Sequence, residues 1–240
     1  MDAAAAKKLA EKSGNSFQCK VANYFRAKNW AVLLSPYYVD ASTDKSRESD
    51  LIVERSFPVT NYFAGTPERS VRLRLFIECK YVSEGVVFWM EAMDSAQAQN
   101  LVFARTPFVR DHQRTREHHY FQNSEPVAKL FASEQRKGEE GDPIYRALNQ
   151  CLNGYIHNET RASMVPTVPK EETTQIDYPV IVCSDFNEFY WTSVANPADP
   201  TPIRRNFLLE VDYAYVSPRK GVTREYFLVD VVDFSVSVRS

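Results

Sequence analysis

The sequence predicts an α/β protein in which helices flank a mixed β-sheet, with a β-rich part at the C-terminal end. Residues 3–29 repeat apolar side chains at helical spacing, whereas 72–80 alternate in the manner of a strand. A nearly continuous apolar run over 178–183 is typical of a strand that is covered on both faces. Helical and strand patterns in this order predict a sheet with helices packed against it.

The first helical segment is expected to break near Gly14, because glycine is a poor interior residue of helices. A short strand follows over 30–34, and the polar segment 40–48 is expected to form a loop. Residues 50–55 and 71–82 predict two antiparallel strands, because a long stretch rich in turn-forming residues joins them. Residues 86–90 continue as a further strand or as the start of a helix.

The second half of the chain has one clear helix signal. Asp142 and Pro143 predict an N-cap followed by proline at the first helical position. The apolar face of this helix consists of Ile144, Leu148, Cys151, Leu152 and Tyr155. Within the polar stretch before it, 127–131 predicts a short helix. Two further β segments are expected over 207–216 and 225–238.

Composition sets limits on the organisation and the partners of the chain. With 240 residues, 44% of them hydrophobic, the chain can form one large domain or two small ones. We expect a single domain over 1–240, with a core over about 14–185, a polar insertion over about 105–141 and a C-terminal β extension over about 186–240. A net charge of −2 excludes a global basic field, so any nucleic-acid surface must be a local patch.

The cysteines and the apolar runs of the sequence indicate the cellular compartment. Four cysteines, Cys19, Cys79, Cys151 and Cys183, are widely spaced, which predicts reduced and mostly buried thiols and disfavours a structural zinc site. Neither a signal peptide nor an apolar run long enough to span a bilayer is evident. The expectation is a cytoplasmic protein without a membrane partner.

Three side chains suggest a catalytic centre. Glu78 and Lys80 lie two positions apart on a predicted strand, so their side chains point the same way. Asp50 stands at the start of another apolar run. Two carboxylates and a lysine can hold a hard divalent cation and organise a water molecule for attack on a phosphate.

Three segments resemble motifs of the restriction-endonuclease-like PD-(D/E)xK nuclease superfamily, nearest to its Mrr-like and Holliday-junction-resolvase-like members. Residues 14–22 resemble its first helix, 48–53 its acidic strand motif and 76–81 its ExK strand. The match covers about 14–82, and the predicted helix around 147–150 agrees with a later element of that core.

The resemblance implies a restriction-endonuclease-like core and hydrolysis of phosphodiester bonds in DNA that depends on Mg²⁺, with Mn²⁺ able to substitute. It assigns Asp50 and Glu78 as metal ligands, joined by the backbone carbonyl of Ile77 or Cys79, and Lys80 as the residue that orients the attacking water. Gln18 occupies a position where many relatives carry a glutamate. With two carboxylates, one metal ion is expected rather than two.

Simpler interpretations stay open for each residue. Glu78 and Lys80 also suit a solvated charge pair, Asp50 a turn at the entry to a strand, and Gln18 an exposed helical position. Other basic residues suit either phosphate contacts or ordinary charged surface: Lys12, Lys20, Arg47, Arg110, Arg114, Arg116, His118 and His119.

The sequence therefore leads to three hypotheses of function. The first is a Mg²⁺-dependent DNA endonuclease acting in restriction, repair or defence against mobile elements. With one site per chain, cutting both strands would favour a homodimer. The alternative is a catalytically inactive nuclease-fold module that binds DNA or a protein, and the third is a nuclease that acts on RNA.

Overall fold

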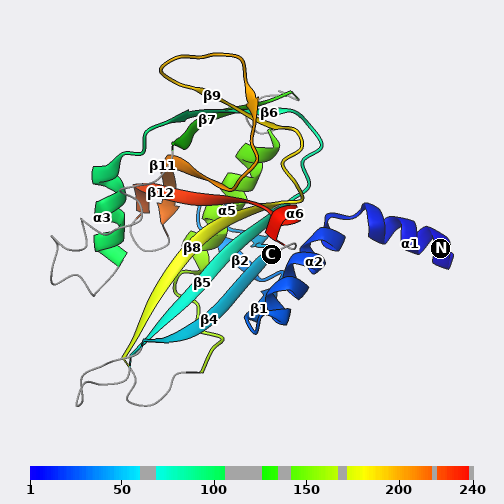
Figure 1. Ribbon diagram of the computed structural model, residues 1–240. Coiled ribbons are helices and arrows are strands. Elements are labelled where there is room, and N and C mark those ends of the chain that lie inside the picture. The colour runs from blue at the N-terminus through cyan, green and yellow to red at the C-terminus, as the bar shows by residue number, and fades with distance from the viewer. Residues whose placement is uncertain (60–68, 106–125, 135–141, 167–171, 218–220, 238–240) are drawn as a thin grey trace.

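The protein is an α/β molecule built on one large mixed sheet, here described from a computed structural model (Figure 1). The structure describes residues 1–59, 69–105, 126–134, 142–166, 172–217 and 221–237. The helices are α1 (Ala3–Lys12), α2 (Gly14–Ala27), α3 (Ser95–Arg105), α5 (Pro143–Asn158) and α6 (Phe234–Ser237). The strands are β1 (Ala31–Leu34), β2 (Tyr37–Asp40), β3 (Lys45–Glu48), β4 (Leu51–Val59), β5 (Arg69–Lys80), β6 (Val86–Glu91), β7 (Val127–Ser133), β8 (Glu172–Cys183), β9 (Phe189–Ser193), β10 (Thr201–Pro202), β11 (Phe207–Ser217) and β12 (Gly221–Asp233).

Ten of these strands form one sheet in the order β1-β4-β5-β8-β12-β11-β7-β6-β9-β10. The first three are antiparallel neighbours, as the hairpin signal predicts for β4 and β5. β8 then lies parallel to β5, and β12 lies parallel to β8. The carboxyl ends of β5, β8 and β12 therefore meet at one edge of the sheet.

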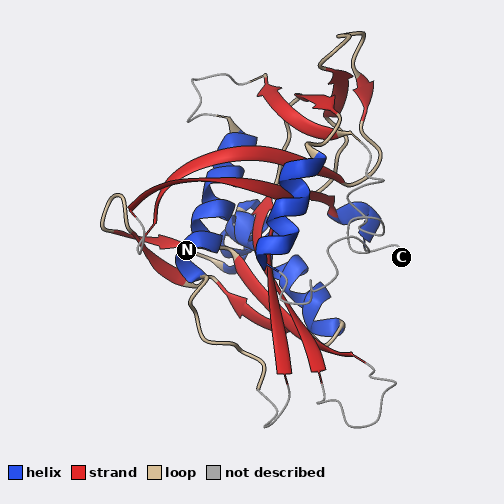
Figure 2. Cartoon of the chain, turned by 90° about the vertical axis from the view of Figure 1, so that its left-hand side faces the viewer, coloured by secondary structure: helices blue, strands red, loops and turns tan. Residues whose placement is uncertain are grey.

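Helices cover the two faces of the sheet, because neighbouring residues of a strand point to opposite sides. Ile52 and Phe76 pack with the apolar side of α5 in one core cluster. Leu51 and Ile77, one position away on each strand, pack with Val21 of α2 in a second cluster. Figure 2 shows helices on either side of the central strands.

Both predicted helix boundaries agree with the structure. The N-terminal segment breaks at Ser13, whose backbone N–H donates to the carbonyl of Leu9 (3.0 Å) before α2 begins at Gly14. α1 then points away from the rest of the molecule (Figure 1). At α5, Oδ1 of Asp142 accepts the backbone N–H groups of Ile144 (2.8 Å) and Tyr145 (3.0 Å), as an N-cap does.

Two predicted local structures are wrong. Residues 127–131, expected as a helix, belong to strand β7, which pairs with β6 on one side and β11 on the other. Residues 40–48, expected as a loop, include the whole of β3, which forms a hairpin with β2. Asp44 supplies the turn of that hairpin in the left-handed region at φ 53°, which short polar side chains tolerate. Residues 86–90 form a strand.

The C-terminal segment is β-rich, and it forms part of the sheet's interior. β11 and β12 pair with each other and lie between β8 and β7. The second of them begins at Gly221 and ends at Asp233, where α6 follows. The segment from about 186 thus contributes central strands as well as the outermost β9 and β10.

A buried arginine ties the end of α5 to the sheet. Arg74 of β5 is 1% exposed, and its guanidinium donates to both oxygens of Asp177 on β8 (3.0 and 2.6 Å). It also donates to the backbone carbonyls of Glu159 (2.8 Å) and Arg161 (2.9 Å), just beyond the last turn of α5. A cation is favoured at this position by the helix dipole.

Asp230 of β12 gives a first prediction, about stability and pH. Burial raises the pKa of its carboxyl to about 6. The folded protein thus binds this proton more tightly than the unfolded chain, so the stability that the carboxyl contributes is complete below pH ~4 and is lost as the pH rises through 6. We expect Asp230→Asn to exceed the wild type in free energy of unfolding by about 1–3 kcal/mol at pH 8 and to match it near pH 4.

Urea denaturation of the wild type and of Asp230→Asn, at a series of pH values from 4 to 8, measures this difference in the free energy of unfolding. The reversed trend, with Asp230→Asn gaining only at acidic pH, would show that this carboxyl is stabilised in its ionised form.

Candidate active site

The start of β4 and the end of β5 lie side by side and bring the three predicted catalytic side chains together. Leu51 pairs with Ile77 in the antiparallel register, so Asp50 stands one position further, opposite Glu78. The backbone N–H of Cys79 donates to Oδ2 of Asp50 over 2.7 Å. The carboxylate of Asp50 therefore reaches across the strand ends to the Glu78–Cys79–Lys80 segment.

Glu78 and Lys80 form a close pair on the face of the sheet that α5 covers. Nζ of Lys80 donates to Oε1 of Glu78 over 2.7 Å, and to Oε1 of Gln150 on α5 over 2.8 Å. Glu78 is 2% exposed, which contradicts a solvated charge pair. The lysine is thus held between a strand carboxylate and a helix amide, with its ammonium group fixed beside Glu78.

The two carboxylates destabilise each other's charge in a poorly hydrated place. Burial, together with the neighbouring charge of Asp50, raises the pKa of Glu78 to about 8, and Lys80 opposes this shift. Burial also raises the pKa of Asp50, against the hydrogen bond from Cys79 and the charge of Lys80. Two such carboxylates accept a bound cation readily, because its charge favours their ionised forms.

The donor set suits one hard divalent cation. Asp50 uses Oδ2 and Glu78 uses Oε1 in the hydrogen bonds above, which leaves Oδ1 of Asp50 and Oε2 of Glu78 as candidate ligand atoms. The N–H and C=O of one strand residue point to the same side, so the Cys79 carbonyl also faces Asp50. Oxygen ligands of this kind suit Mg²⁺, which keeps several waters. No group of three or more His, Cys, Asp or Glu side chains with metal-site geometry occurs in the described part of the chain.

Gln18 of α2 lies beside the site and acts on its backbone. Its Nε2 donates to the main-chain carbonyl of Asp50 (2.6 Å) and lies 3.1 Å from Oγ of Ser35. It is 6% exposed, so the interpretation as an exposed helical residue is wrong. The structure therefore gives this amide a positioning contact with Asp50.

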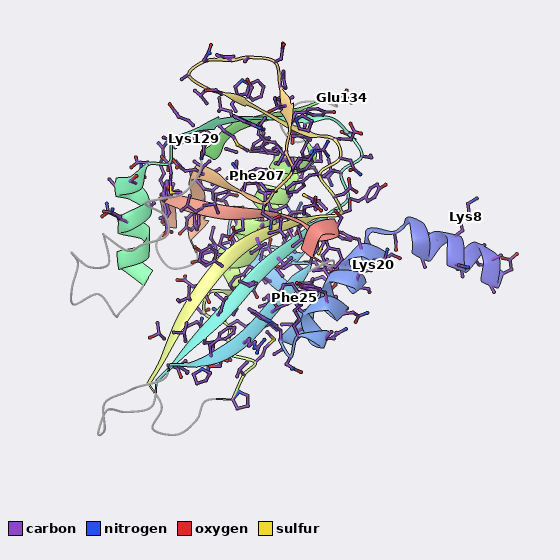
Figure 3. The ribbon with its side chains drawn as sticks, viewed as in Figure 1. Lys8, Lys20, Phe25, Lys129, Glu134 and Phe207 are labelled. Atoms are coloured by element: carbon purple, nitrogen blue, oxygen red, sulfur yellow. The ribbon has the colours of Figure 1, made fainter. Side chains whose placement is uncertain are left out.

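The predicted DNA-contacting residues Lys12, Lys20 and Arg47 belong to three different elements. Lys20 is exposed on α2, and Lys12 ends α1 (Figure 3 labels Lys8 and Lys20 on these helices). Arg47 lies on β3, with Nε 3.6 Å from Oδ2 of Asp40. The basic cluster of Arg110, Arg114, Arg116, His118 and His119 lies outside the described residues.

Sequence reasoning missed the side chains that surround the site from other elements. Gln150 contacts Lys80, and the charge of Arg146, one helical turn earlier, acts on Glu78. Tyr38 of β2 is within electrostatic range of Glu78, and its ring stacks on His157 of α5 (centroids 5.0 Å apart). The signal available in the sequence was the polar side of α5, on which Arg146 and Gln150 are about one helical turn apart.

Cysteine positions agree only in part with expectation. Cys151 and Cys183 are buried and Cys79 is partly buried, whereas Cys19 is exposed on α2. All four are free thiols. Burial and the neighbouring charges of Asp50 and Glu78 raise the pKa of Cys79 well above its ordinary value, which makes this thiol inert at neutral pH.

Comparison with known proteins gives no relative. No family model matches the chain, and neither a curated protein nor a solved structure shows significant similarity to it. Among the described helices, none combines the length and apolar character that crossing a bilayer requires.

Proposed function

We propose that the protein is a Mg²⁺-dependent endonuclease that hydrolyses phosphodiester bonds in DNA, with a restriction-endonuclease-like core. The single observation that carries this proposal is the convergence of Asp50, Glu78 and Lys80 at adjacent strand ends. A buried carboxylate with a second, partly buried one beside it and a fixed ammonium group is costly for stability and suits a cation and a phosphate. Apart from β2, β3, β6, α3 and β7, the order of a helix, three antiparallel strands, a helix and a strand parallel to the third is consistent with the core that the resemblance implies.

In this function each side chain has a distinct role. Asp50, Glu78 and the Cys79 carbonyl would hold the ion, which supplies Lewis-acid stabilisation of the phosphate and a more acidic water. Lys80, with Nζ fixed by Glu78 and Gln150, orients the attacking water or stabilises charge that develops on the phosphate. Gln18 holds the backbone of Asp50 so that its carboxylate stays at the strand ends.

Asp50→Asn tests the proposal directly. The asparagine side chain still offers an oxygen to the Cys79 N–H, so the fold should survive, whereas a charged metal ligand is lost. We expect nicking of supercoiled plasmid in Mg²⁺ or Mn²⁺ to fall by at least about 10²-fold. We also expect calorimetric titration with Mn²⁺ to show much weaker binding.

Asp212→Asn is the matched control, because Asp212 is an exposed carboxylate in an ion pair on the far strand β11. It should leave both readouts unchanged. Undiminished nicking by Asp50→Asn, or nicking that resists a chelator, would refute the site. DNA binding without turnover by the wild type would favour the inactive module, and faster cleavage of single-stranded RNA than of duplex DNA would favour the RNA nuclease.

A further inference from the structure

A pocket of about 340 Å³ is lined by residues of β6, β7, β9 and β11, and by the segment that precedes β11. Among the described residues, β7 and β11 share a single register pair, Ala128 with Leu209. Val127 of β7 and Leu208 of β11, each one position before that pair, both line the pocket. Phe207, at the start of β11, is one of its lining residues (Figure 3).

The lining of the pocket combines an apolar interior with a charged rim. Met90, Phe207 and Leu208 contribute apolar wall. Trp191 of β9, itself 38% exposed, offers part of its indole ring to solvent. Arg204 and Arg205, both exposed, bring two guanidinium groups to the same pocket. This chemistry fits a flat aromatic group that carries negative charge next to it.

The pocket lies at the same edge of the sheet as the candidate active site. The register aligns Lys80 with Cys183 of β8, and Cys183 with Asp233 of β12. Asn206, which precedes β11, accepts the backbone N–H of Asp233 (2.9 Å) and so lies on this row too. Phe207 pairs with Val231 of β12, so the backbone of Arg205, two positions earlier, lies opposite Asp233 and about three strand spacings from that of Lys80, or about 14–15 Å.

Two acidic side chains along that edge, Asp185 and Asp233, accept hydrogen bonds from backbone N–H groups in turns. Asp185 Oδ1 accepts the backbone N–H of Asn187 (3.1 Å). Asp233 Oδ1 accepts that of Ser235 (2.8 Å). Their charges are partly compensated by these hydrogen bonds, so they weaken the attraction of Arg204 and Arg205 for an anion less than free carboxylates would.

Building on the proposed function, we propose that this pocket binds an unpaired nucleotide of the DNA substrate. The base stacks on Trp191, and the flanking phosphates contact Arg204 and Arg205. A span of 14–15 Å corresponds to about four nucleotides of B-form rise, and to fewer in an extended strand. The preferred substrate is therefore DNA with a single-stranded segment within about four nucleotides of the scissile phosphate.

Binding in a chelator tests the pocket without any cleavage. Fluorescence anisotropy compares a labelled oligothymidylate of about 12 nucleotides with a blunt duplex of equal length. We expect the wild type to bind the oligothymidylate more tightly than the duplex. Trp191→Leu should weaken the affinity for the oligothymidylate about tenfold, whereas Trp191→Phe should bind it nearly as the wild type does, because phenylalanine keeps a stacking ring. The double variant Arg204→Ala with Arg205→Ala should weaken the affinity for the oligothymidylate about tenfold. The slope of the logarithm of the binding constant against the logarithm of salt concentration should fall in magnitude by about 1.4.

Arg224→Ala is the control, because it removes an exposed arginine of β12 that pairs with Asp212. Equal binding of the oligothymidylate by the wild type, Trp191→Leu and the double arginine variant overturns the proposal. The proposal is also overturned if the pocket binds an acidic peptide such as oligoglutamate in place of the oligonucleotide, and the same variants weaken that binding.

Failure of the pocket and failure of the nuclease activity give different results. If the pocket is assigned wrongly, Trp191→Leu nicks and binds DNA like the wild type. If the protein is not a nuclease, the wild type leaves DNA uncut in Mg²⁺, while oligonucleotide binding in chelator still reports on Trp191.

Discussion

Lys80→Gln is expected to reduce Mg²⁺-dependent nicking by at least about 10²-fold while the protein still binds Mn²⁺. The ammonium group lies in direct contact with Glu78, at 2.7 Å, and brings a positive charge to the two carboxylates. Glutamine is one bond shorter than lysine and keeps an N–H donor that can face Gln150, but it has no charge to stabilise the phosphate. Both carboxylates stay in place, so an ion still has its ligands.

Comparing metal binding with turnover makes this prediction specific. Calorimetric titration with Mn²⁺ and plasmid nicking are measured on the same preparation, with Lys28→Gln as the control. Lys28 is an exposed lysine at the end of α2. If Lys80→Gln lost metal binding and activity together, its role would be to maintain the carboxylate pair, and the chemical role proposed for it would be wrong.

Much of the site follows from local sequence patterns. The period of two along β5 places Glu78 and Lys80 on one face, and the hairpin register then brings Asp50 opposite Glu78. The capping residue Asp142 and the proline after it mark the start of α5 in the sequence. These elements were predictable because each signal acts within a few residues or through one hairpin.

The errors arose where distant strands decide local structure. Residues 127–131 place Val127, Leu130 and Phe131 at helical spacing, yet the segment also fits a strand. Pairing with β6 and β11, which is not visible locally, decides for the strand. Gln150 joins Lys80 for a similar reason, because only the packing of α5 against β5 brings them together. The pocket beside Trp191 likewise depends on how β6, β7, β9 and β11 assemble, since each contributes lining residues.

The Arg74→Met variant is expected to lose about 3–5 kcal/mol in free energy of unfolding. Methionine fills a similar volume but leaves the carboxylate of Asp177, and the carbonyls of Glu159 and Arg161, without the guanidinium that they now share. Asp177 keeps the hydrogen bonds from Gln175 (3.0 and 3.2 Å), so the loss should not exceed this range. Urea denaturation, with the midpoint compared at constant slope, gives the value.

The chain contains its own control for this prediction. Arg224 and Asp212 form an ion pair of similar length, 2.7 Å, but their side chains are 72% and 51% exposed. Arg224→Met should therefore cost less than about 1 kcal/mol. Adding Asp177→Asn to Arg74→Met should recover part of the loss, because the buried negative charge then disappears with its partner. Equal costs for the buried and the exposed pair would mean that Arg74 is hydrated in solution, and that the last turn of α5 is held to the sheet by apolar packing alone.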